Sequence, residues 1–353
     1  MNRLLVATLA GVASTFLGTA DARGMERVRV ADDGRSFVLA ESGEPFVPWG
    51  FNYDHDEQGR LIEDYWETEW EKVESDFAEM KALGANVVRV HLQFGKFLPK
   101  PGEPDERRLD RLGRLLDLAE RTGLYLDLTG LGCYHAADVP AWYADLPERD
   151  RWDAQARFWE AVAGRCAGRP VVFCYDLMNE PVVPGGKAET WLPGQPLGGK
   201  YFVQYVTRDR AGRERPAIAK EWVRHLVAAI RRRDRDTLVT VGLVPWSLDR
   251  PGLTSGFVPS VIASELDFIA VHLYPEAGKL DEALETLRGF AVGKPVVIEE
   301  TFPLKSGPEE HATFLGRSAE VACGWIGFYW GRTIEEYDPP ATFGEAFTLA
   351  WLR

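Results

Sequence analysis

The chain has 353 residues, of which 45% are hydrophobic and 12% aromatic, which is enough for one large core and excludes disordered and fibrous proteins. It carries 41 Lys and Arg against 54 Asp and Glu, a net charge of −13, and the basic residues are scattered. The composition therefore excludes a nucleic-acid-binding surface and predicts an acidic, soluble protein.

The first 22 residues are predicted to be a secretory signal peptide. A basic MNR is followed by the apolar stretch LLVATLAGVASTFLG and by small residues at Ala20-Asp21-Ala22, which is the pattern of a cleaved leader. An uncleaved anchor is the weaker alternative, because a membrane span needs about 20 apolar residues and this stretch is shorter and contains Thr, Ser and Gly. We expect cleavage near Ala22, a mature domain over residues 23–353, a secreted or periplasmic location and no membrane partner.

The next segment, residues 28–46 (VRVADDGRSFVLAESGEPF), predicts a hairpin that turns at Asp33-Gly34. Beyond it, apolar runs of strand length alternate with amphipathic stretches of helix length, which is typical of a parallel sheet covered by helices. The predicted strands are 45–52, 86–92, 124–130, 170–180, 237–243, 268–274, 295–300 and 324–330. The clearest predicted helices are 69–84, 105–123, 151–168 and 217–234. The pattern predicts an α/β protein, a single (β/α)₈ TIM barrel with the N-terminal β-hairpin at the barrel floor.

Two of these strands end in glutamate. The stretch YDLMNEP closes strand four with Asn179 and Glu180, and PVVIEE closes strand seven with Glu299 and Glu300. Active sites in this barrel lie at the C-terminal ends of the strands, and two carboxylates on facing strands are what glycoside hydrolysis requires. One glutamate alone is as well explained by a surface charge at a strand end, whereas two together favour a catalytic pair.

At these residues the sequence resembles the retaining glycoside hydrolases of clan A, and most closely family 5, the cellulase and β-mannanase family. The likeness runs from about Phe37 to Trp330, nearly the whole mature chain. Its most specific element is Asn179-Glu180-Pro181, which matches the family's Asn-Glu-Pro. The resemblance implies that Glu180 is the acid/base and that Asn179 binds the sugar 2-hydroxyl.

The resemblance also selects the second catalytic residue. In GKPVVIEE the family's glutamate falls five residues after the proline, which implies that Glu300, not Glu299, is the nucleophile. Strand alternation allows only one of these neighbours to face the cleft and does not say which. Arg89 in GANVVRVHL is similar to the family arginine that touches the nucleophile, where its charge would keep Glu300 ionised. His272 and Tyr274 resemble the family's His-x-Tyr, in which the tyrosine bonds the nucleophile and the histidine lines the site.

Three further positions are candidates for the site. Trp330 matches the strand-eight tryptophan that forms the floor of the sugar subsite, a role suited to an aromatic face. Asn52, at the end of strand one, lies where family members carry a polar site residue. His91 shares the face of Arg89 but has no firm family counterpart, so a packing role is an equal alternative.

The sequence departs from the family at strand three, which many members close with a histidine. Here LYLDLTG closes with Thr129 and Gly130, and His135 comes later, in the following loop. The loop after strand four, 182–216, is unusually long and predicts a wall over the cleft, with an ordinary surface excursion as the alternative. Its aromatic residues are Trp191, Tyr201, Phe202 and Tyr205.

The remaining motifs give no sign of a cofactor. There is no Gly-rich phosphate loop and no HExxH, and the 6 histidines lack ligand spacing, so we expect neither metal nor cofactor. The cysteines show neither a disulfide framework nor a metal spacing. Buried thiols are expected, with a Cys166–Cys174 bridge left open. The four cysteines are Cys133, Cys166, Cys174 and Cys323.

The sequence as a whole predicts a secreted, monomeric, retaining β-glycosidase whose partner is a carbohydrate, a β-linked glucan- or mannan-type polysaccharide or oligosaccharide. Glu180 would protonate the leaving group while Glu300 attacks the anomeric carbon, and Glu180 would then activate water. One alternative is a transglycosylase with an acceptor subsite at Trp191 or Trp142. The other is an inactive carbohydrate-binding barrel, against which the presence of both glutamates argues.

Overall fold

The computed structural model describes residues 24–250, 254–328, 331 and 334–352. The predicted signal peptide and Trp330 lie outside the described residues. Within them, no helix is long and apolar enough to cross a membrane.

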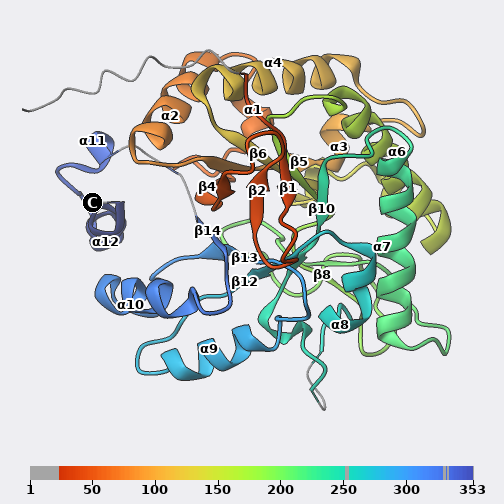
Figure 1. The fold of residues 1–353 in the computed structure, drawn as a ribbon. Helices are drawn as coiled ribbons and strands as arrows, with labels where there is room; N and C mark the ends of the chain where they lie inside the picture. Colours follow the sequence, from red (N-terminus) through yellow and green to blue (C-terminus); the bar gives the residue numbers. More distant parts are fainter. Residues whose placement is uncertain (1–23, 251–253, 329–330, 332–333, 353) are drawn as a thin grey trace, which may run out of the picture.

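Nine described strands form one parallel sheet, in the order β10-β7-β6-β5-β4-β14-β13-β12-β11 (Figure 1). The strands are β4 (Trp49–Tyr53), β5 (Val87–Gln93), β6 (Tyr125–Gly132), β7 (Val172–Asp176), β10 (Leu238–Thr240), β11 (Gly242–Leu243), β12 (Ile269–His272), β13 (Val296–Thr301) and β14 (Gly324–Gly327). β10 and β11 are two pieces of one strand, because only Val241 separates them. β10 pairs with β7 and β11 pairs with β12. The nine strands thus make a closed ring of eight, and the predicted (β/α)₈ barrel is confirmed.

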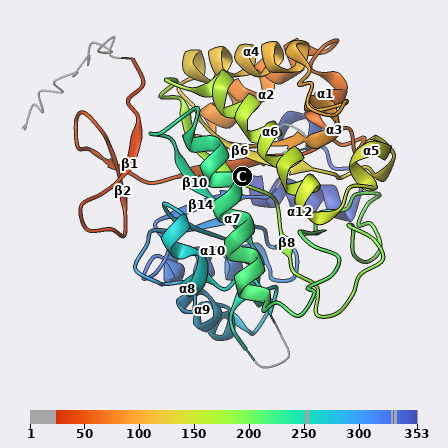
Figure 2. The same cartoon turned by 90° about the vertical axis from the view of Figure 1, so that its right-hand side faces the viewer.

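Helices surround the ring (Figures 1 and 2). The four predicted helices are α2 (Trp70–Ala82), α4 (Glu106–Thr122), α6 (Glu148–Cys166) and α7 (Arg215–Arg231). The others described are α1 (Ile62–Tyr65), α3 (Phe94–Phe97), α5 (Ala141–Ala144), α8 (Pro259–Ile262), α9 (Leu280–Arg288), α10 (Pro308–Ser318), α11 (Ile334–Tyr337) and α12 (Phe343–Leu352).

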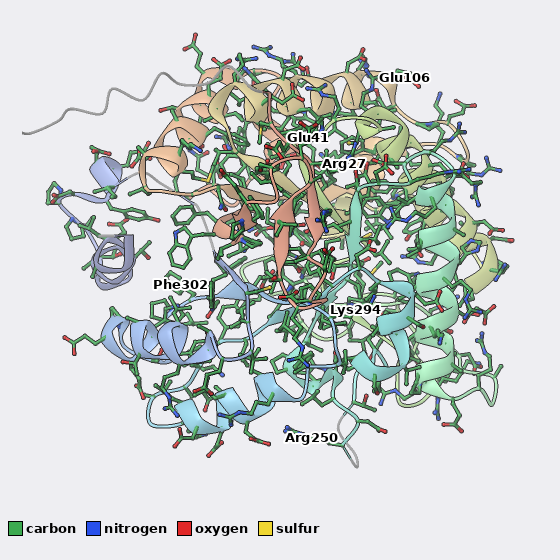
Figure 3. The ribbon with its side chains drawn as sticks, viewed as in Figure 1. Arg27, Glu41, Glu106, Arg250, Lys294 and Phe302 are labelled. Atoms are coloured by element: carbon green, nitrogen blue, oxygen red, sulfur yellow. The ribbon has the colours of Figure 1, made fainter. Side chains whose placement is uncertain are left out.

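Local sequence explains the ends of these helices, as α4 shows. The side chain of Asp105 accepts hydrogen bonds from the first backbone N–H groups of the helix, which would otherwise have no partner. Gly123 ends the helix with φ 70°, a left-handed conformation that glycine adopts without strain. The leucines between them face the barrel, and Glu106 points to solvent (Figure 3).

The hairpin closes the N-terminal end of the barrel. β1 (Val28–Val30), β2 (Phe37–Leu39) and β3 (Pro45–Phe46) form an antiparallel sheet of their own. Val28, Phe37 and Phe46 pack in one buried cluster with Phe173 and Phe268 from the beginnings of barrel strands. Arg27, labelled in Figure 3, donates a 3.2 Å hydrogen bond to Thr237 just before β10. Figure 2 shows β1 and β2 projecting at the left, beyond one end of the barrel, so the floor prediction is confirmed.

Several predicted strands have different bounds in the structure, and strands one and three show this at the two ends of the barrel. The run 45–52 is divided, since Pro45–Phe46 joins the hairpin sheet and only Trp49–Tyr53 enters the barrel. A proline at position 48 has no N–H to offer a sheet, which favours the break there. Strand three does not close at Thr129 and Gly130 but continues to Gly132.

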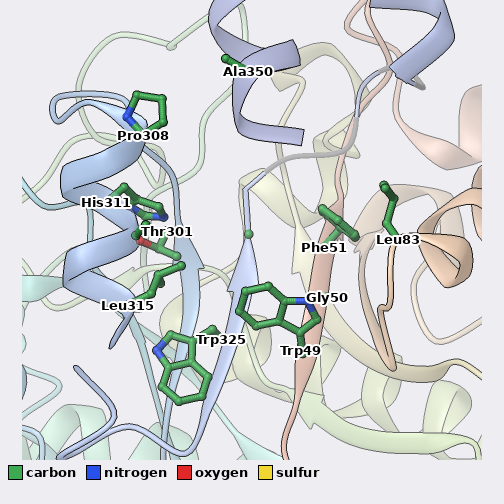
Figure 4. Close-up of a pocket in the computed structure, with 12 residues that line it drawn as sticks. Trp49, Gly50, Phe51, Leu83, Thr301, Pro308, His311, Leu315, Trp325 and Ala350 are labelled. Carbon is green, nitrogen blue, oxygen red and sulfur yellow. The ribbon is translucent and has the colours of Figure 1, made fainter. Parts of the chain in front are cut away.

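A cavity of about 310 Å³ lies outside the barrel, between the outer face of the sheet and the C-terminal helices (Figure 4). Trp49 and Trp325 line it from β4 and β14, and His311 from α10. None of the lining residues is a carboxylate, so this cavity has no part in the catalytic pair.

Candidate active site

A β-bulge in β13 turns both strand-seven glutamates into the barrel. Val271 pairs with Ile298, but the next residue, His272, pairs with Glu300, so β13 contains one extra residue at this point. The alternation predicted that only one of the two glutamates would face inward. In the structure the Glu299 carboxylate lies 3.6 Å from Arg89 and that of Glu300 lies 2.6 Å from it. Glu299 is fully buried beneath the site, whereas Glu300 reaches the cleft.

Glu180 stands beyond the end of its strand rather than in it. β7 ends at Asp176, and Glu180 follows in a turn with φ 46°, an uncommon backbone conformation for a residue with a side chain. Its side chain is 16% exposed. A carboxylate oxygen of Glu180, a ring nitrogen of His272 and a carboxylate oxygen of Glu300 all lie within 4.8 Å of one another. The two predicted catalytic carboxyl groups are therefore brought together.

Arg89 holds the group of predicted residues in place from the barrel interior. Its Nη1 donates to Oε1 of Glu300 at 2.6 Å and to Oδ1 of Asn52 at 2.8 Å. Its Nη2 donates to Asp176 at 2.6 Å and to Oδ1 of Asn179 at 3.0 Å. The guanidinium is fully buried, and such a charge is tolerated only when several acceptors surround it.

Burial sets the net pKa direction of Glu300. The sequence predicted that Arg89 would favour the charged form of this residue. In the structure, burial raises the pKa of Glu300, while His272, Arg89 and the hydroxyl of Tyr274 lower it without fully compensating. Tyr274 donates a 2.7 Å hydrogen bond to Oε2 of Glu300. Thus Arg89 lowers the pKa of Glu300 as predicted, but the net shift of that pKa is upward.

His272 lies between the two glutamates as a cation. Its Nδ1 is 3.0 Å from Oε1 of Glu180 and 3.4 Å from Oε2 of Glu300. Burial opposes protonation, but the charge of Glu300 and the hydrogen bonds to Glu180 and Glu299 outweigh it and raise the pKa of His272 to about 10. The same three side chains are close enough to ligate a metal ion, and two carboxylates on either side of a protonated histidine are also the arrangement of an acid–base pair. We therefore interpret this trio as an acid–base site.

Asn52 and His91 form a hydrogen-bonded support on the other side of Arg89. Nδ2 of Asn52 donates to the carbonyls of Glu299 and Gly327, at 2.9 and 3.2 Å, which leaves Oδ1 as an acceptor. Nε2 of His91 is 3.1 Å from that oxygen, and Nδ1 is 2.5 Å from the hydroxyl of Tyr134. Burial and the charge of Arg89 lower the pKa of His91 to about 3. The imidazole is therefore neutral and carries its proton on Nε2.

Two aspartates under the site were not singled out from the sequence. Asp127 and Asp176 are fully buried inside the barrel. Burial and the charge of Glu299 raise the pKa of Asp176 to about 6 and that of Asp127 well above its ordinary value. The sequence does contain a sign of these residues, because an aspartate interrupts each of the apolar runs LYLDLTG and FCYDLMNE. Asp176 accepts a hydrogen bond from Arg89, whereas the raised pKa of Asp127 favours its neutral form.

A cavity of about 430 Å³ opens beside Glu180, His272 and Tyr274. Trp246, which the sequence did not single out, lines it with 40% of its surface exposed. An exposed aromatic face beside a carboxyl pair suits a sugar ring. The sequence could have indicated this residue, because the tryptophan in VPWSL comes directly after a predicted strand.

The long loop after β7 does reach the site, at Phe202 and at Gln204, whose backbone N–H donates to the carbonyl of Glu180 at 3.4 Å. The carbonyl of Phe202 accepts a 3.0 Å hydrogen bond from Nδ2 of Asn179, and its ring packs on Tyr134. Trp191 in the same loop is only 7% exposed, so it offers no open face to a sugar. Trp142 donates its indole N–H to the carbonyl of Pro99. Trp191 therefore supplies no open acceptor subsite of the kind considered for a transglycosylase, whereas Trp142 is partly exposed.

Comparison with known proteins agrees with this geometry. A model of the cellulase family, glycosyl hydrolase family 5, matches residues 39–312. No curated protein sequence matches the chain.

Solved structures share the fold at low sequence identity. An exo-β-1,4-mannosidase from Opitutaceae bacterium strain TAV5 is 22% identical with a TM-score of 0.65, over 85% of this chain but only 55% of that chain. A β-mannanase from the blue mussel Mytilus edulis is 17% identical with a TM-score of 0.62, over 93% and 96% of the two chains. The catalytic domain of an endoglucanase from Thermobifida fusca is 18% identical with a TM-score of 0.57, over 86% and 85%. Since the family model covers well over half of the sequence, the chain belongs to glycosyl hydrolase family 5, the cellulase family, and is a glycoside hydrolase.

Proposed function

We propose that this protein is a secreted, retaining β-glycosidase that hydrolyses β-linked glucan or mannan chains by double displacement. The observation that carries the proposal is the placement of Glu180 and Glu300, whose carboxyl groups approach within 4.8 Å. Retaining enzymes have carboxyl groups about 5–5.5 Å apart, whereas inverting enzymes need roughly 6.5–9.5 Å to admit a water molecule. The short separation supports direct attack by a carboxylate.

In the first step, Glu300 attacks the anomeric carbon while Glu180 protonates the leaving oxygen. Hydrogen bonds from Arg89 and Tyr274 fix the two oxygens of Glu300. When Glu180 has given up its proton, the cationic His272 at 3.0 Å stabilises the carboxylate that remains. In the second step this carboxylate takes a proton from water, whose oxygen attacks the anomeric carbon and displaces Glu300, so the sugar is released with its original configuration.

The substrate class and the location rest on further observations. The similar structures act, by their names, on β-1,4-linked mannan or as an endoglucanase, which supports a β-linked glucan or mannan as substrate. Trp246 beside Glu180 would hold a sugar of the leaving group. The leader-like N-terminus supports secretion or a periplasmic location.

The test is the stereochemistry of the first product. Proton NMR of a fresh digest of cello-oligosaccharides and manno-oligosaccharides should show the β-anomer first and the α-anomer only after mutarotation. Initial release of the α-anomer would refute the retaining mechanism. Reducing-end release from glucan, mannan and xylan identifies the sugar, and a product mixture dominated by longer oligosaccharides would show transglycosylation instead.

A further inference from the structure

A buried arginine on α6 has no counter-charge. The guanidinium of Arg151 is 2% exposed, and Nη1 donates to the carbonyl of Tyr143 at 2.7 Å. Its Nε has no hydrogen-bond partner, and no carboxylate in the described part of the chain forms an ion pair with it. Arginine is almost never fully buried without an acidic partner. The unpartnered Nε and the missing counter-charge of Arg151 therefore need an explanation.

The surroundings of this arginine form a cavity rather than a packed core. The space measures about 420 Å³ and lies between the loop after β6 and the long loop after β7. Its lining residues include Cys133, Ala136, Arg151, Trp191, Tyr201 and Arg208. A cavity of this size holds several water molecules or one sugar-sized group.

A second arginine reinforces the positive charge. Trp191 lies against both guanidinium groups, with Arg151 at 4.2 Å and Arg208 at 5.0 Å from the ring centroid. Arg208 donates to the backbone carbonyl of Glu189 and, like Arg151, forms no ion pair with a described carboxylate. Asp145 and Glu189 also line the cavity, but both are solvent-exposed and pair with neither arginine. Burial and the neighbouring Arg208 both lower the pKa of Arg151, as expected for a cation that lacks a counter-ion.

The cavity adjoins the catalytic residues without containing them. Two of its lining residues, Cys133 and Tyr201, are chain neighbours of Tyr134 and Phe202, whose rings lie 5.1 Å apart and separate the cavity from the site. Phe202 in turn bonds Asn179. The cavity thus lies one residue along the chain, on both loops, from side chains that contact the site.

We propose that the Arg151 cavity binds the anionic group of an acidic sugar, either the carboxylate of a uronic acid or a sulfate ester. A guanidinium held between aromatic rings presents a rigid set of N–H donors, which suits two oxygens of such a group. The assignment to a glycan rests on the proposed function, whereas anion binding itself does not.

The experiment measures binding to the intact protein by calorimetry and by the shift in melting temperature, at equal and low ionic strength because salt screens the attraction. The probes are glucuronate, glucose 6-sulfate and neutral glucose. We expect one or both acidic sugars to bind and to raise the melting temperature, and glucose not to. The acidic sugar that binds identifies the source of the anion. Equal binding of all three sugars, or binding of none, overturns the proposal.

Three variants assign the binding to the cavity. Arg151→Gln should weaken it by about tenfold or more, and Arg208→Gln should weaken it less, which keeps the test valid if the buried variant fails to fold. Arg149→Gln is the matched control, because Arg149 lies on the same helix, is exposed and pairs with Glu221. Unchanged binding in both Arg151→Gln and Arg208→Gln would overturn the proposal. All three variants should hydrolyse a neutral aryl glycoside like the wild type, so a failure of the proposed catalytic function would be seen separately.

Discussion

The hydroxyl of Tyr274 donates a 2.7 Å hydrogen bond to Oε2 of Glu300. The other oxygen of Glu300 accepts from Arg89 at 2.6 Å. Both carboxylate oxygens are thus held by donors that favour the charged form, while burial acts against it. The pKa of the proposed nucleophile therefore depends on opposing effects, and a single substitution should change it.

Tyr274→Phe should move the acidic limb of the pH–activity profile to higher pH. Removal of the hydroxyl leaves burial less opposed and raises the pKa of Glu300 further, and activity is lost as pH falls through that pKa. We expect a shift of roughly one pH unit in kcat/KM with an activated aryl glycoside. Tyr125→Phe, at the barrel floor, is the control and should leave the limb in place. A shift to lower pH would contradict the assignment.

Glu180→Gln should remove proton donation to the leaving group. Hydrolysis of substrates with poor leaving groups should fall by about 10²–10⁴-fold, while an activated aryl glycoside should still react in the first step. Glu189→Gln, an exposed change in the loop after β7, serves as control. Equal losses for good and poor leaving groups would count against Glu180 as the acid.

The adjacent glutamates can be separated by chemical rescue. Glu300→Ala should be inactive, because no carboxylate can attack the anomeric carbon, and azide should restore turnover by entering the vacated space and forming an α-glycosyl azide. Glu299→Gln should keep measurable turnover, since that side chain is fully buried below the cleft. The reverse result, an inactive Glu299→Gln with a working Glu300 variant, would show that the strand-seven assignment is wrong.

His91 should make the fold sensitive to acid. Its pKa is about 3 in the folded protein against about 6.5 in an unfolded chain, so the unfolded state binds the proton first. The stability that the neutral imidazole contributes is full above pH 6.5 and is lost as pH falls towards 3, by about 2 kcal/mol between pH 6.5 and 5.

Urea unfolding measured across that pH range tests this. His91→Gln should flatten the dependence, because glutamine retains a donor and an acceptor but does not titrate. Burial also lowers the pKa of His311, to about 4, so the variant keeps part of the slope and the double variant with His311→Gln should lose most of it. A slope unchanged in His91→Gln would refute the assignment.

The cysteines should all be thiols. Cys133, Cys166 and Cys174 are buried and Cys323 is partly exposed, and none is bridged in the structure. Alkylation of the denatured chain without reductant should therefore modify four thiols, as measured by mass. Two modified thiols or none would show that a disulfide forms on export.

Much of the fold was predictable because its signals are local. The alternation of β5 correctly predicts that Arg89 and His91 share one face, since the register shift between β5 and β6 falls after His91. The same reasoning fails at Glu299 and Glu300, because the extra residue in β13 is set by its pairing with β12 and β14. Period-two patterns carry no sign of such a shift.

Other features depend on contacts between distant segments. The turn that carries Glu180 was predicted as the end of a strand, and its left-handed backbone is not a conformation that glutamate favours by itself. Trp191 was predicted only as part of a wall over the cleft or, with Trp142, as an alternative acceptor subsite, but it lies against two arginines, one of them from α6. Trp330 is a prediction that lies outside the described residues. Long-range packing places Glu180 and Trp191, and the composition of the sequence does not reveal such packing.

The bulge in β13 has a consequence for engineering this barrel. One additional residue reverses the in/out alternation of the side chains that follow it. Glu299 and Glu300 therefore both face inward because of the bulge, not because of their residue type. Deletion of Glu299 would straighten the strand and keep Glu300 inward, at the cost of the carboxylate that faces His272 at 3.5 Å. Transplanting residues 296–301 into a barrel with a regular seventh strand would instead direct one of the two carboxylates into the surrounding helices. The segment can therefore be transplanted only into a barrel whose two neighbouring strands have the same register as β12 and β14.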